Sequence, residues 1–137
     1  MRAHPSLKIL LLLIIFSFPL VESYGADGNE IIIAITSTGT SFDSMIHENF
    51  GRSAYILLFN YTEETLTVIG NPGAGLQSGA GRRAAETVIN NGATHLVTGN
   101  IGDKVIDLLK DAGIEIITGV KKSITVKEAI EMVRAGM

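Results

Sequence analysis

The sequence predicts an α/β domain built on one mixed sheet of about five strands. A continuous apolar run of strand length comes first, and two strand-like runs joined by a short polar link come next. The second half of the chain then alternates helix with strand. Strands separated by helices of this length are parallel through right-handed crossovers, whereas the early pair is antiparallel. The sheet is therefore expected to contain both kinds of pairing.

The first half of the domain is predicted to supply three strands. The run "EIIIAITS" (30–37) is apolar throughout, which is typical of a strand covered on both faces. The runs "AYILLFN" (54–60) and "TLTVIGN" (65–71) flank the link "YTEE" and predict a hairpin. Residues 37–53 show no clear period, so we expect a long loop there, and loops of this length are often functional.

The second half is predicted to supply two strands and three helices. The expected order is helix 79–90, strand 94–99, helix 102–111, strand 114–119 and a helix that begins at Thr125. Thr125 and Glu128 have the spacing of a capping box. The apolar side chains expected to face the sheet are Ala80, Ala84, Ala85, Val88, Ile89, Val105, Ile106, Leu108, Leu109, Val126, Ala129, Ile130 and Val133.

The amino terminus has the pattern of a secretory signal peptide. Arg2 and Lys8 precede the apolar run 9–18, and small residues follow as plausible cleavage positions. The run is shorter than the roughly 20 residues that a spanning helix needs. We therefore predict a signal peptide at 1–26 and one domain at 27–137, exported to the periplasm or the extracellular space. If the leader is retained, it tethers the domain to the membrane.

Charge and cysteine content exclude several functions. The chain has 11 basic and 14 acidic residues, and the predicted leader removes Arg2, Lys8 and Glu22. That leaves 9 against 13, a net charge near −4. A mildly acidic domain of this kind has no electrostatic footprint for nucleic acid. The absence of cysteine excludes disulfides and thiolate-held clusters, so a metal would need His, carboxylate or backbone oxygen.

Three segments are expected to meet beyond the carboxyl ends of the parallel strands, where sheets of this class bind ligands. They are the loop 37–53, the glycine-rich stretch "NPGAGLQSGAGRRAAE" (71–86) and "TGNIGD" (98–103). Backbone N–H groups at a helix start favour an anionic ligand, and glycine allows close approach. The candidate binding residues are His47, Asn49, Gly51, Arg52, Gly79, Gly81, Gly99 and Asn100.

Each candidate also has a purely structural interpretation. The glycines before a helix serve equally as packing or turn residues, and Asn100 serves as a helix cap. His95 lies inside a strand, which favours a hydrogen-bonded core histidine, and Arg82 and Arg83 are expected in solvent. His47 is the candidate metal ligand because it lies in a polar loop beside acidic residues, although one histidine is a weak metal signature.

Catalytic motifs are absent from the sequence. It contains no cysteine nucleophile, no GxSxG elbow and no HExxH helix, and no carboxylate pair is placed on adjacent strands. We therefore predict a protein that is not an enzyme. The remaining catalytic hypothesis is a hydrolase, for which Asp43 and Asp103 would be the residues to test.

Three stretches of the sequence together resemble the dinitrogenase iron-molybdenum cofactor biosynthesis family. They are "FDSMIHENFGRSAY", "NPGAGLQSGAGRRAAETVINNGATHLVTGNIGDKVIDLLKDAGIEIITG" and "TVKEAIE". The family includes carriers and scaffolds of nitrogenase cofactor assembly and small stand-alone members. The resemblance covers about residues 30 to 135. It implies a ribonuclease H-like, three-layer α/β/α fold with a five-stranded mixed sheet. It also implies non-catalytic binding of an iron-containing or iron-molybdenum-type cluster.

The chain departs from the family at the position before its Phe-Gly pair. Cofactor-binding members commonly carry a histidine there, whereas this chain has Asn49, with His47 two residues earlier. The first hypothesis is thus an exported, non-catalytic binding protein for a metal ion, a metal cluster or a related anionic cofactor. The alternative is an exported sensing or interaction module that binds a small organic anion or a protein partner without metal. Neither involves nucleic acid, or a membrane once the leader is removed.

Overall fold

A five-stranded mixed sheet forms the centre of the domain. The computed structural model describes residues 30–137. The strands are β1 (Ile32–Ser37), β2 (Tyr55–Asn60), β3 (Thr65–Gly70), β4 (His95–Val97) and β5 (Glu115–Ile117). Their order across the sheet is β3-β2-β1-β4-β5. The pairs β1–β2 and β2–β3 are antiparallel, and the pairs β1–β4 and β4–β5 are parallel. The predicted mixed sheet is confirmed.

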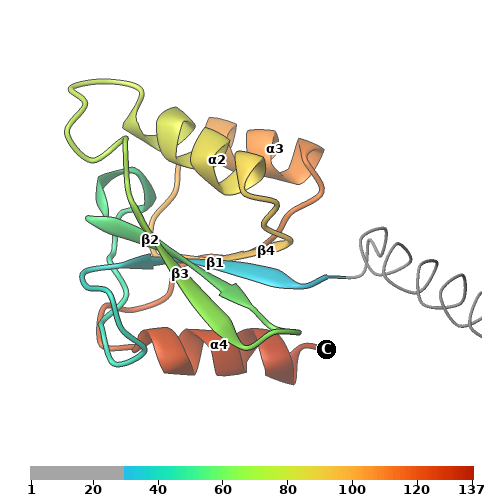
Figure 1. Ribbon diagram of the computed structural model, residues 1–137. Helices are drawn as coiled ribbons and strands as arrows, with labels where there is room; N and C mark the ends of the chain where they lie inside the picture. The colour runs from blue at the N-terminus through green and yellow to red at the C-terminus, as the bar shows by residue number, and fades with distance from the viewer. Residues whose placement is uncertain (1–29) are drawn as a thin grey trace, which may run out of the picture. The chain divides into compact units, whose positions relative to one another are not determined.

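Helices cover both faces of the sheet (Figure 1). α2 (Ala80–Asn90) and α3 (Asp103–Asp111) lie on one face, and α4 (Val126–Ala135) lies on the other. Two apolar cores result, one between the sheet and α4 and one between the sheet and the α2–α3 pair. This arrangement confirms the predicted three-layer α/β/α fold.

The central strand β1 is apolar on both sides because each side supplies one core. Ile33 and Ile35 pack in the α4 core, and Ala34 between them packs in the α2–α3 core. All three side chains are fully buried. Side chains alternate between the faces of a strand, so a strand at the centre of three layers needs apolar residues at successive positions. The uninterrupted run in the sequence has this cause.

The predicted leader lies outside the described residues, as do residues 27–29 of the predicted domain. Within residues 30–137, no helix has the length and apolar character that crossing a membrane requires.

The segment between β1 and β2 is a loop, as predicted, but two of its side chains belong to the core. Ile46 is fully buried in the α4 core, and Phe50 is 1% exposed in the other. Phe50 opens the short 3-10 helix η1 (Phe50–Arg52). Single apolar anchors in a polar segment produce no periodic signal, so the pattern of residues 37–53 could not reveal them.

The helices differ from the prediction in detail. α2 buries Ala80, Ala84, Ala85 and Val88, and α3 buries Leu109. Leu108 was expected to face the sheet, but that prediction is wrong, because its side chain is 36% exposed. α3 packs against the core through Leu109 and Val105, and Leu108 lies outside both cores. The cap of α3 is Gly102, so Asn100 does not serve as a helix cap.

The predicted capping box begins α4. The Thr125 side chain accepts a hydrogen bond from the Glu128 N–H (3.2 Å), and the Glu128 carboxylate accepts one from the Thr125 N–H (3.2 Å). All four predicted apolar residues of this helix are buried: Val126, Ala129, Ile130 and Val133.

Thr125→Ala is expected to lower the free energy of unfolding by about 1 kcal/mol, because the first turn of α4 loses a hydrogen-bond acceptor. Urea unfolding followed by circular dichroism measures the loss. The matched control is Thr62→Ala, at an exposed turn residue, with an expected change within about 0.5 kcal/mol. Equal losses in the two variants would contradict the role of the cap.

Candidate functional site

Three loops meet at the carboxyl-terminal edge of the parallel strands. They follow β1, β4 and β5 and comprise residues 38–54, 98–102 and 118–125. Ligands of open α/β sheets bind at this edge, because loops and helix starts converge there. Two of the three loops were predicted from the sequence to take part.

Main-chain hydrogen bonds join the first loop to the second. The Phe50 N–H donates to the Asn100 carbonyl (3.0 Å), and the Asn100 N–H donates to the Glu48 carbonyl. Asn49 and Asn100 thus form a parallel bridge. The structure therefore brings together Asn49 and Asn100, two candidates that are far apart in the sequence.

Gly99 allows this close approach. A Cβ atom at Gly99 would overlap the Glu48 backbone, lying 2.8 Å from both its carbonyl carbon and its Cα. Every other residue type carries a Cβ, so only glycine fits between the two loops. Gly99 therefore acts here through backbone packing.

The third loop is attached to the second from the other side. The Gly119 N–H donates to the Gly99 carbonyl (2.9 Å), and the Val120 N–H donates to the Thr98 carbonyl (3.2 Å). Gly119 has a φ of +73°, which favours glycine. Residues 98–100 are consequently held between the two other loops.

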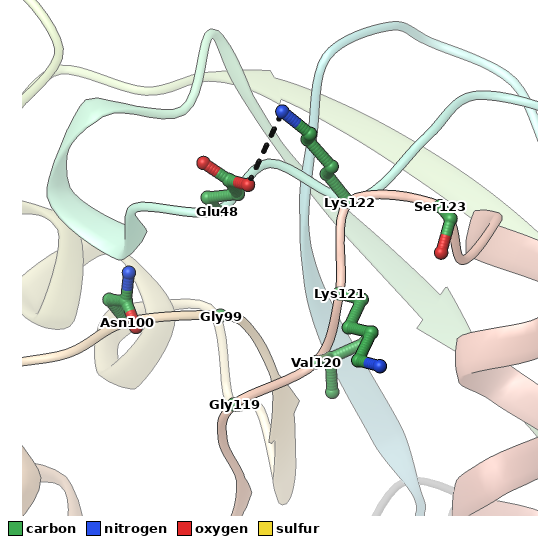
Figure 2. A pocket seen from close by; sticks show the side chains of 8 residues that line it. All are labelled: Glu48, Gly99, Asn100, Gly119, Val120, Lys121, Lys122 and Ser123. Atoms are coloured by element: carbon green, nitrogen blue, oxygen red, sulfur yellow. Dashed lines mark ion pairs between the residues drawn. The ribbon is translucent and has the colours of Figure 1, made fainter.

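A pocket of about 420 Å³ opens between these loops (Figure 2). Its lining consists of Glu48, Gly99, Asn100 and residues 119–123. Figure 2 shows the Glu48 and Lys122 side chains pointing toward each other from the first and third loops, and their charged atoms are 3.7 Å apart. Lys121 contributes a second ammonium group on the third loop. The wall formed by 119–123 therefore carries two cationic side chains, and that of Lys122 is paired with the single carboxylate opposite it.

A buried polar link joins the ends of β1 and β4, next to the lining residue Gly99. The hydroxyl oxygens of Thr36 and Thr98 are 2.8 Å apart, and both residues are fully buried. The Thr36 hydroxyl also lies 3.2 Å from the His47 carbonyl, to which it donates. The ends of β1 and β4 are thereby tied to the first loop, which stabilises the position of the pocket walls.

His47 precedes the lining residue Glu48 but does not itself line the pocket, and its imidazole is held by its own loop. Nδ1 lies 3.0 Å from the Asn49 backbone nitrogen and 3.1 Å from the Asn49 carbonyl oxygen. If Nδ1 carries the proton, it donates to the carbonyl, and Nε2 has a free lone pair. If Nδ1 is unprotonated, it accepts from the N–H, and Nε2 is a donor. The ring can thus present either a ligand atom or a hydrogen-bond donor.

Arg52 is engaged with the glycine-rich segment. Its guanidinium donates to the Ala74 carbonyl (3.3 Å), to the Leu76 carbonyl and to the Gln77 carbonyl (3.4 Å). These bonds tie η1 to the loop that precedes α2. Arg52 therefore holds these two segments together and does not line the pocket.

Gly51, Gly79 and Gly81 lie around the start of α2. A Cβ at Gly51 would lie 2.7 Å from the Gly81 nitrogen, and a Cβ at Gly81 would lie 3.1 Å from the Val105 side chain. Gly79 caps α2 with a φ of +74°. Close packing accounts for Gly51 and Gly81, and a left-handed turn accounts for Gly79. These three glycines do not line the pocket.

The sequence reasoning missed the third loop. The lining residues Glu48, Lys121 and Lys122 are not among the residues predicted to bind. A signal was present, because "TGVKKS" follows the second parallel strand just as "TGNIGD" follows the first. Because ligands bind beyond the carboxyl ends of parallel strands, the segment after this strand also indicates a site, and it contains the two lysines.

The other titratable candidates lie elsewhere. His95 is partly buried, with Nδ1 2.8 Å from the Thr94 hydroxyl and Nε2 3.3 Å from a Glu115 oxygen, which agrees with a hydrogen-bonded structural role. Asp43 lines a different pocket, beside Phe42, and Asp103 is the first residue of α3. Within residues 30–137, no three side chains of His, Cys, Asp or Glu lie close enough together to hold a metal ion.

Comparisons with known proteins agree with the fold and the motifs. The orange protein from Desulfovibrio gigas, solved in its apo form, matches with a TM-score of 0.72 and 29% identity over 77% of this chain and 88% of that chain. A Thermotoga protein solved under the provisional description of a NifB protein of the DUF35 family has a TM-score of 0.64 and 24% identity, over 77% and 89%. This second likeness concerns the fold alone.

No protein of curated function matches the chain. The sequence profile described as dinitrogenase iron-molybdenum cofactor matches residues 29–136, which include nearly all of the described domain. The resemblance inferred from the motifs is thereby confirmed. The chain belongs to the dinitrogenase iron-molybdenum cofactor family.

Proposed function

We propose that the protein is a non-catalytic, exported binding protein for an anionic metal cluster or a related anionic cofactor. The observation that carries this proposal is the pocket between the three loops, whose lining includes Lys121, Lys122 and Asn100. Family membership supports the class of cargo. Ammonium groups and exposed amide groups are the donors that an anion requires.

The donor set favours capture by charge and hydrogen bonds over full coordination. Cysteine is absent from the sequence, and residues 30–137 contain no trio of metal-ligating side chains. A cluster that arrives with its own inorganic ligands and a negative charge needs few protein ligands. The pocket residues fit such a cargo, with Lys121 and Lys122 as its counter-charges.

His47 is the one side chain that we assign as a direct metal ligand. With Nδ1 donating to the Asn49 carbonyl, Nε2 is free to bind a metal atom of the cargo. The Asn49 backbone therefore orients the ring and selects the ligating nitrogen. We place the remaining predicted contacts, Asn49, Gly51, Arg52, Gly79, Gly81 and Gly99, in shaping the loops around the cargo.

The alternative function is an exported sensing or interaction module without metal. The cationic wall favours a small organic anion equally well, because a carboxylate binds lysine by the same contacts as a cluster. In this case His47 would serve as a donor through Nε2.

The deciding experiment is anaerobic purification of the protein from its native compartment, with metal analysis and an absorption spectrum. The metal hypothesis expects iron or molybdenum together with a visible band, both diminished in His47→Ala. A metal-free, colourless protein that cannot be reconstituted would rule it out. A thermal-shift screen of organic anions then tests the alternative, because a bound ligand raises the melting temperature.

The double variant Lys121→Ala and Lys122→Ala is expected to weaken anion binding by roughly tenfold, since two charge-assisted contacts at an exposed site are lost. Titration of molybdate, monitored by calorimetry, measures the change. Lys110→Ala is the matched control, because Lys110 is also exposed but lies in the last turn of α3, at the other end of the sheet. Equal affinity in both variants would place the anion elsewhere.

A further inference from the structure

The strand β3 forms an open edge of the sheet. It is the last strand in the order, and its neighbour is β2. No other segment within residues 30–137 forms a β-bridge with it. Unpaired N–H and C=O groups along such an edge can pair with another strand.

The register shows which groups point outward. The Asn71 N–H donates to the Ala54 carbonyl (3.0 Å), so residues 71 and 54 form a hydrogen-bonded pair. Such pairs alternate along antiparallel strands, so Thr65, Thr67 and Ile69 bond to β2. The backbone groups of Leu66, Val68 and Gly70 therefore point away from the sheet.

This edge lacks the usual protection against pairing. β3 has six residues, "TLTVIG", with no charge and no proline, and its Val68 is 42% exposed. The opposite edge strand, β5, has three residues and carries the exposed Glu115. Short length and charge are the common means of blocking an edge. The two edges of this sheet thus differ, and β3 is the one suited to pairing.

Within residues 30–137, no neighbouring atom requires position 70 to be glycine. A Cβ built on it meets no atom within 4 Å, and its φ is not positive. Glycine weakens a strand, and within a strand it often marks the close approach of another backbone. Gly70 therefore points to an approach from outside the sheet.

We propose that two copies of the chain pair through β3 in antiparallel orientation, around a two-fold axis at Val68. In this register Val68 faces its own copy and Leu66 faces Gly70. All outward backbone groups of the strand are then used in mutual pairs, each exchanging two hydrogen bonds. Gly70 leaves room for the Leu66 side chain of the other copy. The two sheets become one continuous sheet.

Charge complementarity favours a second copy as the occupant. The acidic turn residues Glu63 and Glu64 precede β3. The guanidinium of Arg52 is hydrogen-bonded to carbonyls of residues 74–77, in the segment that follows β3. An antiparallel pair brings the acidic end of one strand to the cationic end of the other. β3 itself has no charged residue, so the paired strands place no like charges opposite each other.

Analytical ultracentrifugation of the purified protein across a concentration series tests the proposal. We expect a reversible dimer with a Kd on the order of micromolar, because one strand pair buries less surface than a standard interface. Val68→Lys and Val68→Glu each place like charges on the axis, and each is expected to weaken the dimer roughly tenfold or more. An equimolar mixture of the two variants is expected to regain dimerisation.

The controls are Leu108→Lys and Leu108→Glu, at an exposed apolar residue of α3 far from the edge, and both are expected to dimerise like the parent. Gly70→Val is a second edge variant. Its added side chain meets open space in a single chain but meets Leu66 of the other copy in the dimer, so it should weaken the dimer. A parent protein that stays monomeric overturns the proposal. Association that persists unchanged in Val68→Lys, or a variant mixture that stays monomeric, overturns it as well.

Discussion

Gly99→Ala is expected to lower the free energy of unfolding by about 3 kcal/mol or more, since the added Cβ overlaps main-chain atoms in a packed site. The overlapped atoms belong to Glu48, whose backbone cannot move without breaking its bond to the Asn100 N–H. The variant should therefore also lose the pocket. Urea unfolding measures the stability, and calorimetric titration of molybdate measures the site.

Gly75→Ala is the matched control for Gly99→Ala. A Cβ on Gly75 meets no atom within 4 Å, and its φ is not positive. The same chemical change should therefore alter stability by less than about 0.5 kcal/mol, or raise it slightly by restricting the unfolded chain. If Gly99→Ala were as stable as Gly75→Ala, the two loops would not cross at Gly99.

Phe50→Ala is expected to cost about 3–5 kcal/mol, the range for removing a buried aromatic ring from a core. Phe50 is 1% exposed and packs in the α2–α3 core, while its N–H donates to Asn100. The cavity therefore opens directly under the first loop. Thermal unfolding followed by calorimetry, with the unfolding enthalpy measured for each variant, gives the loss in the free energy of unfolding.

Phe42→Ala serves as the comparison. Phe42 lies in the same loop and is 40% exposed, with one edge-on contact to Phe59 at 5.9 Å between ring centroids. Its removal should cost about 1 kcal/mol, the scale of one aromatic pair. Similar losses for the two phenylalanines would show that the first loop is not anchored through Phe50.

The sheet and its helices could be predicted because their signals are local. A run of apolar residues such as 30–37 reports burial on both faces, and Thr125 with Glu128 reports a helix start within four residues. The exposed Leu108 marks the limit of such reasoning. Periodicity shows that a residue is on the apolar side of a helix. Whether its side chain is buried depends on how far the packing of that helix against the core extends.

The site could be predicted only in part, because its contacts are long-range. The edge of the sheet and the segments around His47 and Asn100 followed from strand order. The contact of Gly99 with Glu48 joins residues about fifty positions apart, and no local pattern encodes it. Glycine at positions 51, 79, 81 and 99 has the same appearance in sequence, yet the structure uses it for packing in three cases and for a turn in one.

The position of β1 at the middle of the sheet also affects the order in which the protein folds. Its neighbour β2 joins β3 through a short turn, so that pair can form early. Its other neighbour, β4, is distant in the chain, and the bond from the Ile32 N–H to the Thr94 hydroxyl spans 62 positions. Closing so long a loop costs entropy before contacts compensate for it. The walls of the pocket follow β1, β4 and β5, so the pocket is complete only after these long-range strand pairs have formed.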